Sequence, residues 1–400
     1  MKAETMSVDS KSPPLVSVVM PVLNEEKYIA EALESLANQE YPNIELIVVD
    51  DGSSDSTPDI LENYSKCSSS PFPLEVIRHA EPKGVSAAKN TGLAKAKGKY
   101  LAIVAGDDVQ RRNRISLPAG ILEEHSSCDI VFLDCDMIDF EGNPLNRKKG
   151  YPERMTGKNA MLFQLRRNHL FSGLFLARRE ACPTFDETLP SGVDYEWSWR
   201  ALLEKRRIRI LHDSVTKYRI HQNNLSANAA QSSEALARTM GKLDLEAVRD
   251  DLSKEGFPKD EIAVGLAWAS LAANRPEQCL GYLRDLKNQD DGLKREQSFA
   301  SGVAWWKTGN LHEAEKAFTT ILEDSPSDAV SANNLAVLLA LQGKDPHQVA
   351  ALLEQAVKQR SEYRDASDNL TQARKGDLVT LRFTERPLRD NVIHDQHYRL

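Results

Sequence analysis

The sequence has 400 residues, more than one ordinary hydrophobic core holds, so we expect about two or three domains. Hydrophobic residues make up 41% and charged residues 28% of the chain, a composition that excludes a mainly disordered protein. With 51 basic and 59 acidic residues the formal net charge is −8, which argues against a protein whose main task is to coat nucleic acid.

The cysteines and the apolar runs bear on the cellular compartment. Five cysteines are scattered with no C-x-x-C pair, so neither a disulfide framework nor a cysteine zinc site is indicated. Residues 1–14 are polar and lack the apolar core of a signal peptide. The longest apolar run, Leu335–Leu341, is far shorter than the roughly 18 residues of a membrane span. We therefore expect a disordered tail over 1–14 and a cytoplasmic protein without a membrane span or a nucleic acid partner.

Short apolar runs alternate with helical patterns in the first half of the chain. Such runs, apolar on both faces and separated by helices, are typical of a parallel sheet covered on both sides. The pattern predicts strands over residues 16–20, 45–50, 74–79 and 100–104, and helices over 25–39, from 57 and over 85–96. Further on it predicts strands over 129–140, 170–179 and in the runs RIRIL and VTKYRIH, with a helix over 193–204.

Polar clusters follow three of these strands: residues 24–26, residues 50–55 and residues 106–108. Because the carboxyl ends of parallel strands meet at one edge, where ligands bind, these clusters predict a site. The carboxylates of Asp107 and Asp108 suit Mg²⁺ or Mn²⁺, and the alternative is a solvated aspartate turn. The cluster at 50–55 either accepts hydrogen bonds from a base or ribose, or forms an Asx turn that caps the next helix.

The second half of the chain has a different character. Residues 229–375 lose the β-branched runs and gain alanine, leucine and glutamine at helical spacing. Gly309 and Gly343 mark an internal repeat of 34 residues, and a weaker copy starts at Ala267. A helix–turn–helix period of this length resembles tetratricopeptide repeats, so we expect a small solenoid over 229–375. Residues 376–400 are expected to be a tail, in which LVTLRF is a candidate strand.

Four motifs occur in order between Val16 and Ala227, and each resembles a segment of family 2 glycosyltransferases. They are VSVVMPVLNEEKYIAEALESLANQEYPNIELIVVDDGSSDST, GVSAAKNTGLAKAKGKYLAIVAGDD, FDETLPSGVDYEWSWRAL and YRIHQNNLSA. The resemblance implies an α/β fold of the GT-A type, with a Rossmann-like, mostly parallel sheet over 15–228. The all-α repeat domain would follow it.

The resemblance also implies roles for individual positions in the donor pocket. Asp51 matches the carboxylate that reads the uracil edge, and Asp107 matches the aspartate that faces the ribose and the sugar. Lys89 lies near the nucleotide, where the family usually has arginine. The nucleotide-sugar-binding residues implied in this way are Pro21, Asn24, Glu25, Asp51, Lys89 and Asp107.

A divalent metal, Mn²⁺ or Mg²⁺, is implied as the cofactor. Asp108 matches its ligand, and His221 matches a residue that approaches the metal or the diphosphate, supported by Lys217 and Arg219. Asp194 matches the catalytic base, with Glu196 on the same helix as the alternative. A base on one side of the anomeric carbon and a metal on the other give direct displacement with inversion.

Several positions depart from the family pattern. Leu23 replaces a common aromatic residue, Ala105 and Gly106 replace the earlier aspartate of a D-x-D, and Val193 replaces an acid. The helix over 193–204 also carries two tryptophans: core packing explains Trp197, whereas for Trp199, on a different face, a sugar contact and core packing are equally good interpretations. The basic run at 147–149 is interpreted as solvated charge.

The resemblance implies an inverting, metal-dependent hexosyltransferase that moves a sugar from a nucleotide sugar, expected to be UDP-linked, to a hydroxyl of a glycan or protein. The repeat domain would bind the acceptor, a protein partner or a second copy, or would have a purely structural role and cover one flank of the catalytic domain. The departures from the pattern motivate an alternative, a nucleotide-binding interaction protein with a degenerate transferase domain. A nucleotidyltransferase is disfavoured, because PVLNEE is acidic where a loop that cradles a triphosphate is rich in glycine and basic residues.

Overall fold

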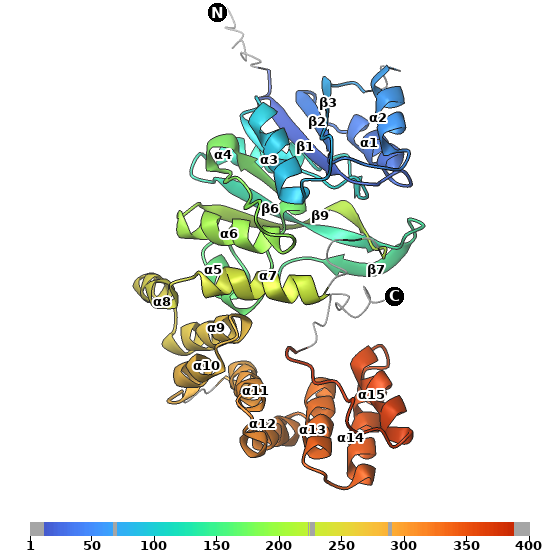
Figure 1. The fold of residues 1–400 in the computed structure, drawn as a ribbon. Coiled ribbons are helices and arrows are strands. Elements are labelled where there is room, and N and C mark those ends of the chain that lie inside the picture. The colour runs from blue at the N-terminus through green and yellow to red at the C-terminus, as the bar shows by residue number, and fades with distance from the viewer. Residues whose placement is uncertain (1–11, 67–69, 223, 225–228, 287–289, 388–400) are drawn as a thin grey trace, which may run out of the picture. The chain divides into compact units, whose positions relative to one another are not determined.

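The computed structural model describes residues 12–66, 70–222, 224, 229–286 and 290–387. The chain forms two compact units (Figure 1). The first comprises Met1–Lys158 and Leu170–Ile220, and the second comprises Asn159–His169 and His221–Leu400. Residues 159–169 join the second unit because their helix, α5 (Ala160–Arg166), packs on α9 (Lys259–Ala272). A Cβ on Gly265 of α9 would lie 3.0 Å from Leu165 Cδ1.

The first unit is built on one nine-stranded sheet. Its first half consists of β1 (Val16–Val22), β2 (Ile44–Asp50), β3 (Leu74–Arg78) and β4 (Tyr100–Ile103). These four strands are parallel and lie in the order β3-β2-β1-β4, so the strands predicted for this region are confirmed. The chain begins in the middle of the sheet and winds outward, which is the Rossmann-like order.

The second half of the sheet mixes directions. β8 (Phe175–Arg178) runs antiparallel to β4 and β6, whereas β6 (Ile130–Ile138) and β9 (Ile208–Arg219) are parallel. β5 (Val109–Gln110) and β7 (Pro144–Lys149) pair antiparallel with β9 and β6. The two strands expected after residue 205 form a single strand, β9. Shifts in the pairing register with β6 accommodate residues 212 and 213, so β9 continues along β6 without a break.

Helices cover both faces of the parallel half. Val18 and Met20 of β1 face α1 (Ile29–Ala37), α2 (Thr57–Lys66) and α4 (Ser116–Glu124). Val19 points to the other face, where α3 (Val85–Lys95) lies so close that a Cβ on Gly92 would collide with it. Figure 1 shows α3 on the opposite side of these strands from α1 and α2. Alternate strand residues thus fill two cores, as the apolar pattern predicts.

An aromatic cluster holds α6 (Val193–Leu203) in place. Trp197 stacks on Phe175 of β8, with ring centroids 4.7 Å apart, and on Phe185 at 5.7 Å. The short helices η1 (Ser172–Leu174) and η2 (Arg179–Ala181) flank β8. Trp199 is 1% exposed and packs edge-on against Tyr195, so of the two interpretations left open for it, core packing is confirmed and the sugar contact is wrong.

In the described residues of the second unit, every regular secondary-structure element is a helix. In addition to α5 and α9 it contains α7 (Ala229–Gly241), α8 (Leu245–Lys254), α10 (Pro276–Leu283), α11 (Asp291–Lys307), α12 (Leu311–Asp324), α13 (Ala329–Leu341), α14 (Pro346–Gln359) and α15 (Arg364–Arg374). No helix in the described residues has both the length and the apolar character needed to cross a bilayer.

Antiparallel helix pairs follow the sequence repeat. The turns inside the pairs α11–α12 and α13–α14 place Gly309 at φ 79° and Gly343 at φ 67°, a region that favours glycine. Asn310 and Asp345 cap the second helix of each pair by accepting backbone N–H groups. The expected strand LVTLRF is wrong for the described residues, because this segment lies against helices and finds no strand to pair with.

A close approach of α11 and α12 generates a stability prediction. A Cβ on Gly302 would lie 2.7 Å from Cε2 of Phe318, which is fully buried and has no room to move. We expect Gly302→Ala to destabilise the chain by about 1–3 kcal/mol. The matched control Gly281→Ala, in α10 with nothing within 4 Å of its Cβ, should stabilise it by about 0.5–1 kcal/mol. Urea unfolding followed by circular dichroism measures both, and equal effects would contradict the packing argument.

Candidate active site

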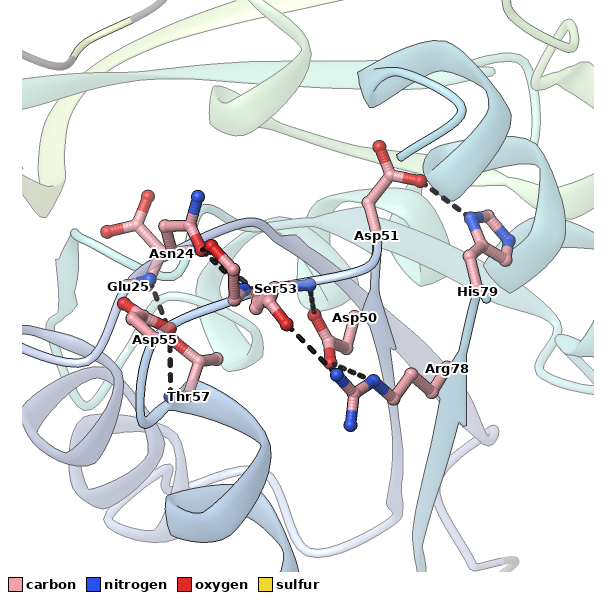
Figure 2. Close-up of polar contacts among 10 residues, drawn as sticks. Asn24, Glu25, Asp50, Asp51, Ser53, Asp55, Thr57, Arg78 and His79 are labelled. Atoms are coloured by element: carbon pink, nitrogen blue, oxygen red, sulfur yellow. Dashed lines mark hydrogen bonds and ion pairs between the residues drawn. The ribbon is translucent and has the colours of Figure 1, made fainter. Parts of the chain in front are cut away.

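The carboxyl ends of β1 and β2 are joined by side-chain hydrogen bonds (Figure 2). Asn24 has a left-handed backbone, with φ 57°. Its N–H donates to Ser53 Oγ at 2.9 Å, and its Oδ1 accepts the N–H of Ser54 at 2.9 Å. The N–H of Glu25 donates to Thr57 Oγ1 at 2.8 Å. These bonds make the loops after β1 and β2 one rigid wall of the sheet edge.

Asp50 and Asp55 have structural roles in this wall. Asp50 accepts the N–H of Ser53 at 2.9 Å and pairs with Arg78, whose Nε lies 3.3 Å from Asp50 Oδ2. Asp55 Oδ1 accepts the N–H of Thr57 at 2.9 Å and so caps α2. For these two aspartates the turn-and-cap interpretation of the 50–55 cluster holds.

Asp51 points to the other side, toward His79 (Figure 2). Its Oδ1 lies 2.6 Å from His79 Nδ1 and accepts the N–H of Lys83 at 2.9 Å, while its Oδ2 accepts the N–H of Gly84 at 2.8 Å. An ionised carboxylate has about four acceptor positions. Protein groups occupy three of these positions. One acceptor position of Asp51 is left for the predicted contact with the edge of a base.

Three more carboxylates gather where β4 ends. Burial raises the pKa of Glu25 to about 8, with Asp107 and Asp55 adding repulsion. Burial and the charge of Asp107 likewise raise the pKa of Asp108 well above its usual value. Gly106 makes the approach possible, because a Cβ there would lie 2.7 Å from Val22 Cγ1. The same crowding leaves no room at position 106 for the side chain of an earlier aspartate of a D-x-D.

Arg219, the last residue of β9, binds the turn of Asp107 and Asp108 through both its backbone and its side chain. Its backbone N–H donates to Asp108 Oδ1 at 2.9 Å, and its buried guanidinium donates to Asp107 O at 2.9 Å and to Glu31 Oε2 at 2.5 Å. The sequence analysis expected Arg219 to support His221 in its approach to the metal or the diphosphate. Its side chain instead binds Asp107 O and Glu31, and its backbone N–H binds Asp108, so the residue positions both aspartates.

Asp194, at the start of α6, belongs to a second polar cluster. Ser172 Oγ and Lys89 Nζ both donate to its Oδ1, at 2.5 and 3.2 Å, and Lys89 also donates to Ser172 Oγ at 2.8 Å. Although burial acts in the opposite direction, the Lys89 charge and the Ser172 hydrogen bond lower the pKa of Asp194. Its side chain remains 28% exposed. Lys89 therefore contacts the predicted base, a placement that its resemblance to a nucleotide-binding arginine did not indicate.

Glu196 faces away from this cluster. Arg200 binds both of its oxygens, at 2.6 and 2.9 Å, one helical turn further along α6. Because Glu196 lies two residues from Asp194, the two acids point to different sides of the helix. The structure therefore separates the two candidate bases and leaves Asp194 beside Lys89 and Ser172.

Lys149, in β7, is a residue that the sequence analysis missed. Its charge opposes the rise in the pKa of Asp108 and contributes to the lowered pKa of Asp194. Its Nζ lies over the rings of Phe171 at 4.0 Å and Tyr218 at 4.3 Å. A run of three basic residues is usually solvated, and only the pairing of β7 with β6 turns this one lysine toward the acids.

The remaining predicted residues lie as follows. Pro21 is half-buried in β1 opposite Val49 of β2, and Leu23, next to it in the loop, is 41% exposed. His221 is the first residue of the second unit after Ile220, and its N–H donates to Asn224 Oδ1 at 2.7 Å. Its role as a metal ligand stays a prediction.

Acids at the carboxyl edge of a Rossmann-like sheet, with a further aspartate on a later helix, are the arrangement expected of a glycosyltransferase of the GT-A type. The family described as Glycosyl transferase family 2 matches residues 17–184. An uncharacterized glycosyltransferase of Rickettsia typhi is 30% identical over 233 residues, which are 56% of this chain and 70% of that protein. The chain belongs to family 2 of the glycosyltransferases.

Other relatives cover different shares of their own length. The putative teichuronic acid biosynthesis glycosyltransferase TuaG of Bacillus subtilis is 28% identical over 54% of this chain and 82% of TuaG. The poly(ribitol-phosphate) β-N-acetylglucosaminyltransferase TarS of Staphylococcus aureus is 29% identical over 62% of this chain, but the match spans 42% of TarS. The solved structure of TarS residues 1–349 with UDP-GlcNAc aligns with a TM-score of 0.50 at 20% identity, covering 94% of this chain and 98% of that one, which supports the fold.

The buried contacts of Arg219 generate a second prediction. Arg219→Met keeps the backbone N–H that binds Asp108 but leaves the buried Asp107 O without its side-chain donor, so we expect a loss of about 1–3 kcal/mol in the free energy of unfolding. Arg112, 76% exposed and 3.8 Å from Glu40, offers the matched control, and Arg112→Met should change stability by less than about 0.5 kcal/mol. Urea titration of the two full-length variants measures the difference. A similar effect of both would show that Arg219 does not hold the turn.

Proposed function

We propose that this glycosyltransferase is an inverting, metal-dependent enzyme that moves a hexosyl group from a nucleotide sugar to an acceptor hydroxyl, with Asp194 as the base. The observation that carries the proposal is the asymmetry of the Asp194 carboxylate. Ser172 and Lys89 hold its Oδ1, whereas its Oδ2 accepts no hydrogen bond from the described part of the chain. An oriented carboxylate with one free oxygen is what a general base needs.

In this mechanism Asp194 Oδ2 accepts the proton of the acceptor hydroxyl as that oxygen attacks the anomeric carbon. The pKa of Asp194 lies below its usual range, so the group is ionised at neutral pH, which is the form that a general base requires. Ser172 and Lys89 fix its orientation, because both bind the other oxygen. A single displacement of this kind inverts the configuration at the anomeric carbon, and Glu196, held by Arg200, takes no part.

The acidic turn fits a divalent cation. Glu25, Asp107 and Asp108 offer hard oxygen ligands, and their mutual repulsion and burial favour neutralisation by a cation. We propose that Asp108 holds Mn²⁺ or Mg²⁺, with Asp107 beside it and His221 as a further ligand. When bound, the cation supplies charge stabilisation to the departing diphosphate. Arg219 keeps both aspartates in position.

The donor proposed here is a UDP-sugar, with UDP-GlcNAc tested first. TarS, which shares the family, has been solved with UDP-GlcNAc. Pro21, Asn24 and the remaining acceptor position of Asp51 would contact the nucleotide. The acceptor would be a hydroxyl of a glycan or a protein.

The proposed division of labour places the transferase domain over 15–228 and a tetratricopeptide-like repeat domain, which binds the acceptor or a protein partner, over 229–375. We also propose a cytoplasmic location. The described cysteines Cys128, Cys135, Cys182 and Cys279 are free thiols, which supports a reducing compartment.

The central test measures release of UDP from UDP-GlcNAc in the presence of Mn²⁺. We expect Asp194→Asn to lower kcat roughly 100- to 10 000-fold, because the amide does not accept a proton, while UDP binding persists. The control Glu196→Gln should keep most of the activity. Binding of UDP without any turnover by the wild-type chain would favour the alternative, a degenerate nucleotide-binding protein. Activity that survives chelation and Asp108→Asn would remove the metal from the proposal.

Lys149 is proposed to stabilise charge on the departing diphosphate. Replacing it by methionine keeps the contacts with the two aromatic rings but removes the charge, so kcat should fall about tenfold or more. The exposed neighbour Lys148 provides the control, and Lys148→Met should change kcat less than about twofold. Steady-state kinetics with saturating donor compare the two, and equal activities would leave Lys149 without a catalytic role.

A further inference from the structure

Residues 381–385, here called the C-terminal segment, lie along the helical unit without forming a helix or strand. The chain leaves α15 through a turn at Asp377, whose carboxylate accepts the N–H groups of Val379 and Thr380. It then packs Leu381 and Phe383 against the core of the helices. The segment therefore contacts the unit as an extended ligand contacts its receptor.

Two asparagines hold the backbone of alternate residues in this segment. Asn369 Oδ1 accepts the N–H of Arg382 at 2.7 Å, and its Nδ2 donates to Arg382 O at 2.8 Å. Asn334 Oδ1 accepts the N–H of Thr384 at 2.9 Å, and its Nδ2 donates to Thr384 O at 2.8 Å. Each amide thus replaces the two hydrogen bonds that a neighbouring β-strand would make.

The two asparagines occupy equivalent places in the repeat. Asn334 is the sixth residue of α13 and Asn369 is the sixth residue of α15. Both are buried, and Asn333 beside them donates to Arg382 O at 3.2 Å and accepts from Asn369 at 2.8 Å. Buried amides are destabilising without partners, so these positions require a polypeptide backbone beside them. The surface formed by Asn333, Asn334, Asn369 and their neighbours, which the C-terminal segment covers, is here called the groove.

Side chains of the segment contact side chains of the helices, and these contacts would select the sequence of a bound peptide. Phe383 stacks on Trp306, with centroids 4.1 Å apart, and meets Phe318 edge-on at 5.6 Å. The hydroxyl of Thr384 lies 2.5 Å from Tyr363 Oη and 3.1 Å from Asp365 Oδ2. Glu385 pairs with Lys307 at 2.9 Å. The groove thus fits an aromatic residue, a hydroxyl residue and an acid in succession.

We propose that the helical unit is a binding site for extended polypeptide, which the C-terminal segment occupies in cis until a partner protein presents a segment of the same chemistry. Alternate backbone groups of the ligand pair with Asn334 and Asn369, and an aromatic side chain between them enters the slot of Trp306 and Phe318. This inference deepens the partner-binding role proposed above. Its test reads peptide binding rather than sugar transfer, so either proposal can fail without the other.

A covalent tether keeps the groove occupied. Residues 375–380 join the segment to α15, and so short a linker gives an effective concentration in the millimolar range. A free peptide therefore competes poorly with the wild-type segment. Removing the aromatic anchor from the segment should release it and expose the groove.

The experiment uses full-length chains and a fluorescein-labelled peptide with the sequence of Thr380–Arg386. By fluorescence anisotropy we expect Phe383→Ala to bind the peptide at least about tenfold more tightly than the wild type. Adding Asn369→Ala to that variant should weaken binding about tenfold or more, with circular dichroism confirming the fold. If folded Phe383→Ala does not bind the peptide, the segment is a fixed part of the unit and the proposal is overturned.

Modified peptides test the backbone contacts without any further change to the protein. N-methylation at the position of Thr384 removes the N–H that Asn334 accepts, and should weaken binding to the Phe383→Ala chain at least about tenfold. The same modification at Phe383, whose N–H makes no hydrogen bond with the described residues, is the matched control and should have a smaller effect. Equal effects of both, or displacement of the peptide by N-acetylglucosamine oligomers, would overturn a polypeptide site.

Discussion

The repulsion among buried carboxylates at the carboxyl edge of β1, β2 and β4 is the constraint around which the first unit is arranged. Gly106 lets the loop after β4 approach Glu25, and this brings a third acid to Asp107 and Asp108. The protein offsets part of the charge from two sides. Arg219 binds the turn that carries the aspartates, and the charge of Lys149 reaches Asp108 from β7. The negative charge that remains uncompensated is the physical basis of the cation proposed above.

Asp194 is in the opposite electrostatic environment. The pKa values of Glu25 and Asp108 are raised, whereas Lys89 and Ser172 lower that of Asp194. Sites that separate the pKa values of their acids in this way assign them different tasks. Here the crowded carboxylates with raised pKa values are the proposed cation site, and Asp194, which stays ionised at neutral pH, is the proposed base. Trp197, one helical turn after Asp194, fixes the rotation of α6 through its stack on Phe175.

The helical unit repeats the principle that buried polar groups determine what must lie beside them. Asn334 and Asn369 are in the interior, where an unpaired amide is destabilising. They are satisfied by the backbone of an irregular segment rather than by another helix. The apolar pattern of the sequence does not single out these asparagines, because it marks them only as polar positions within a helix.

By itself, the sequence determined the four parallel strands, the change to helices after residue 228 and the 34-residue period, because each is a local pattern of apolar residues and turns. It also placed Asp107, Asp108 and Asp194 as candidates through their motifs. Only the tertiary structure decided which acids share an environment, that Lys89 contacts Asp194, and that Lys149 acts on two aspartates. Such relations depend on strands and helices far apart in the chain, and charge interactions follow distance and burial in space rather than separation along the sequence.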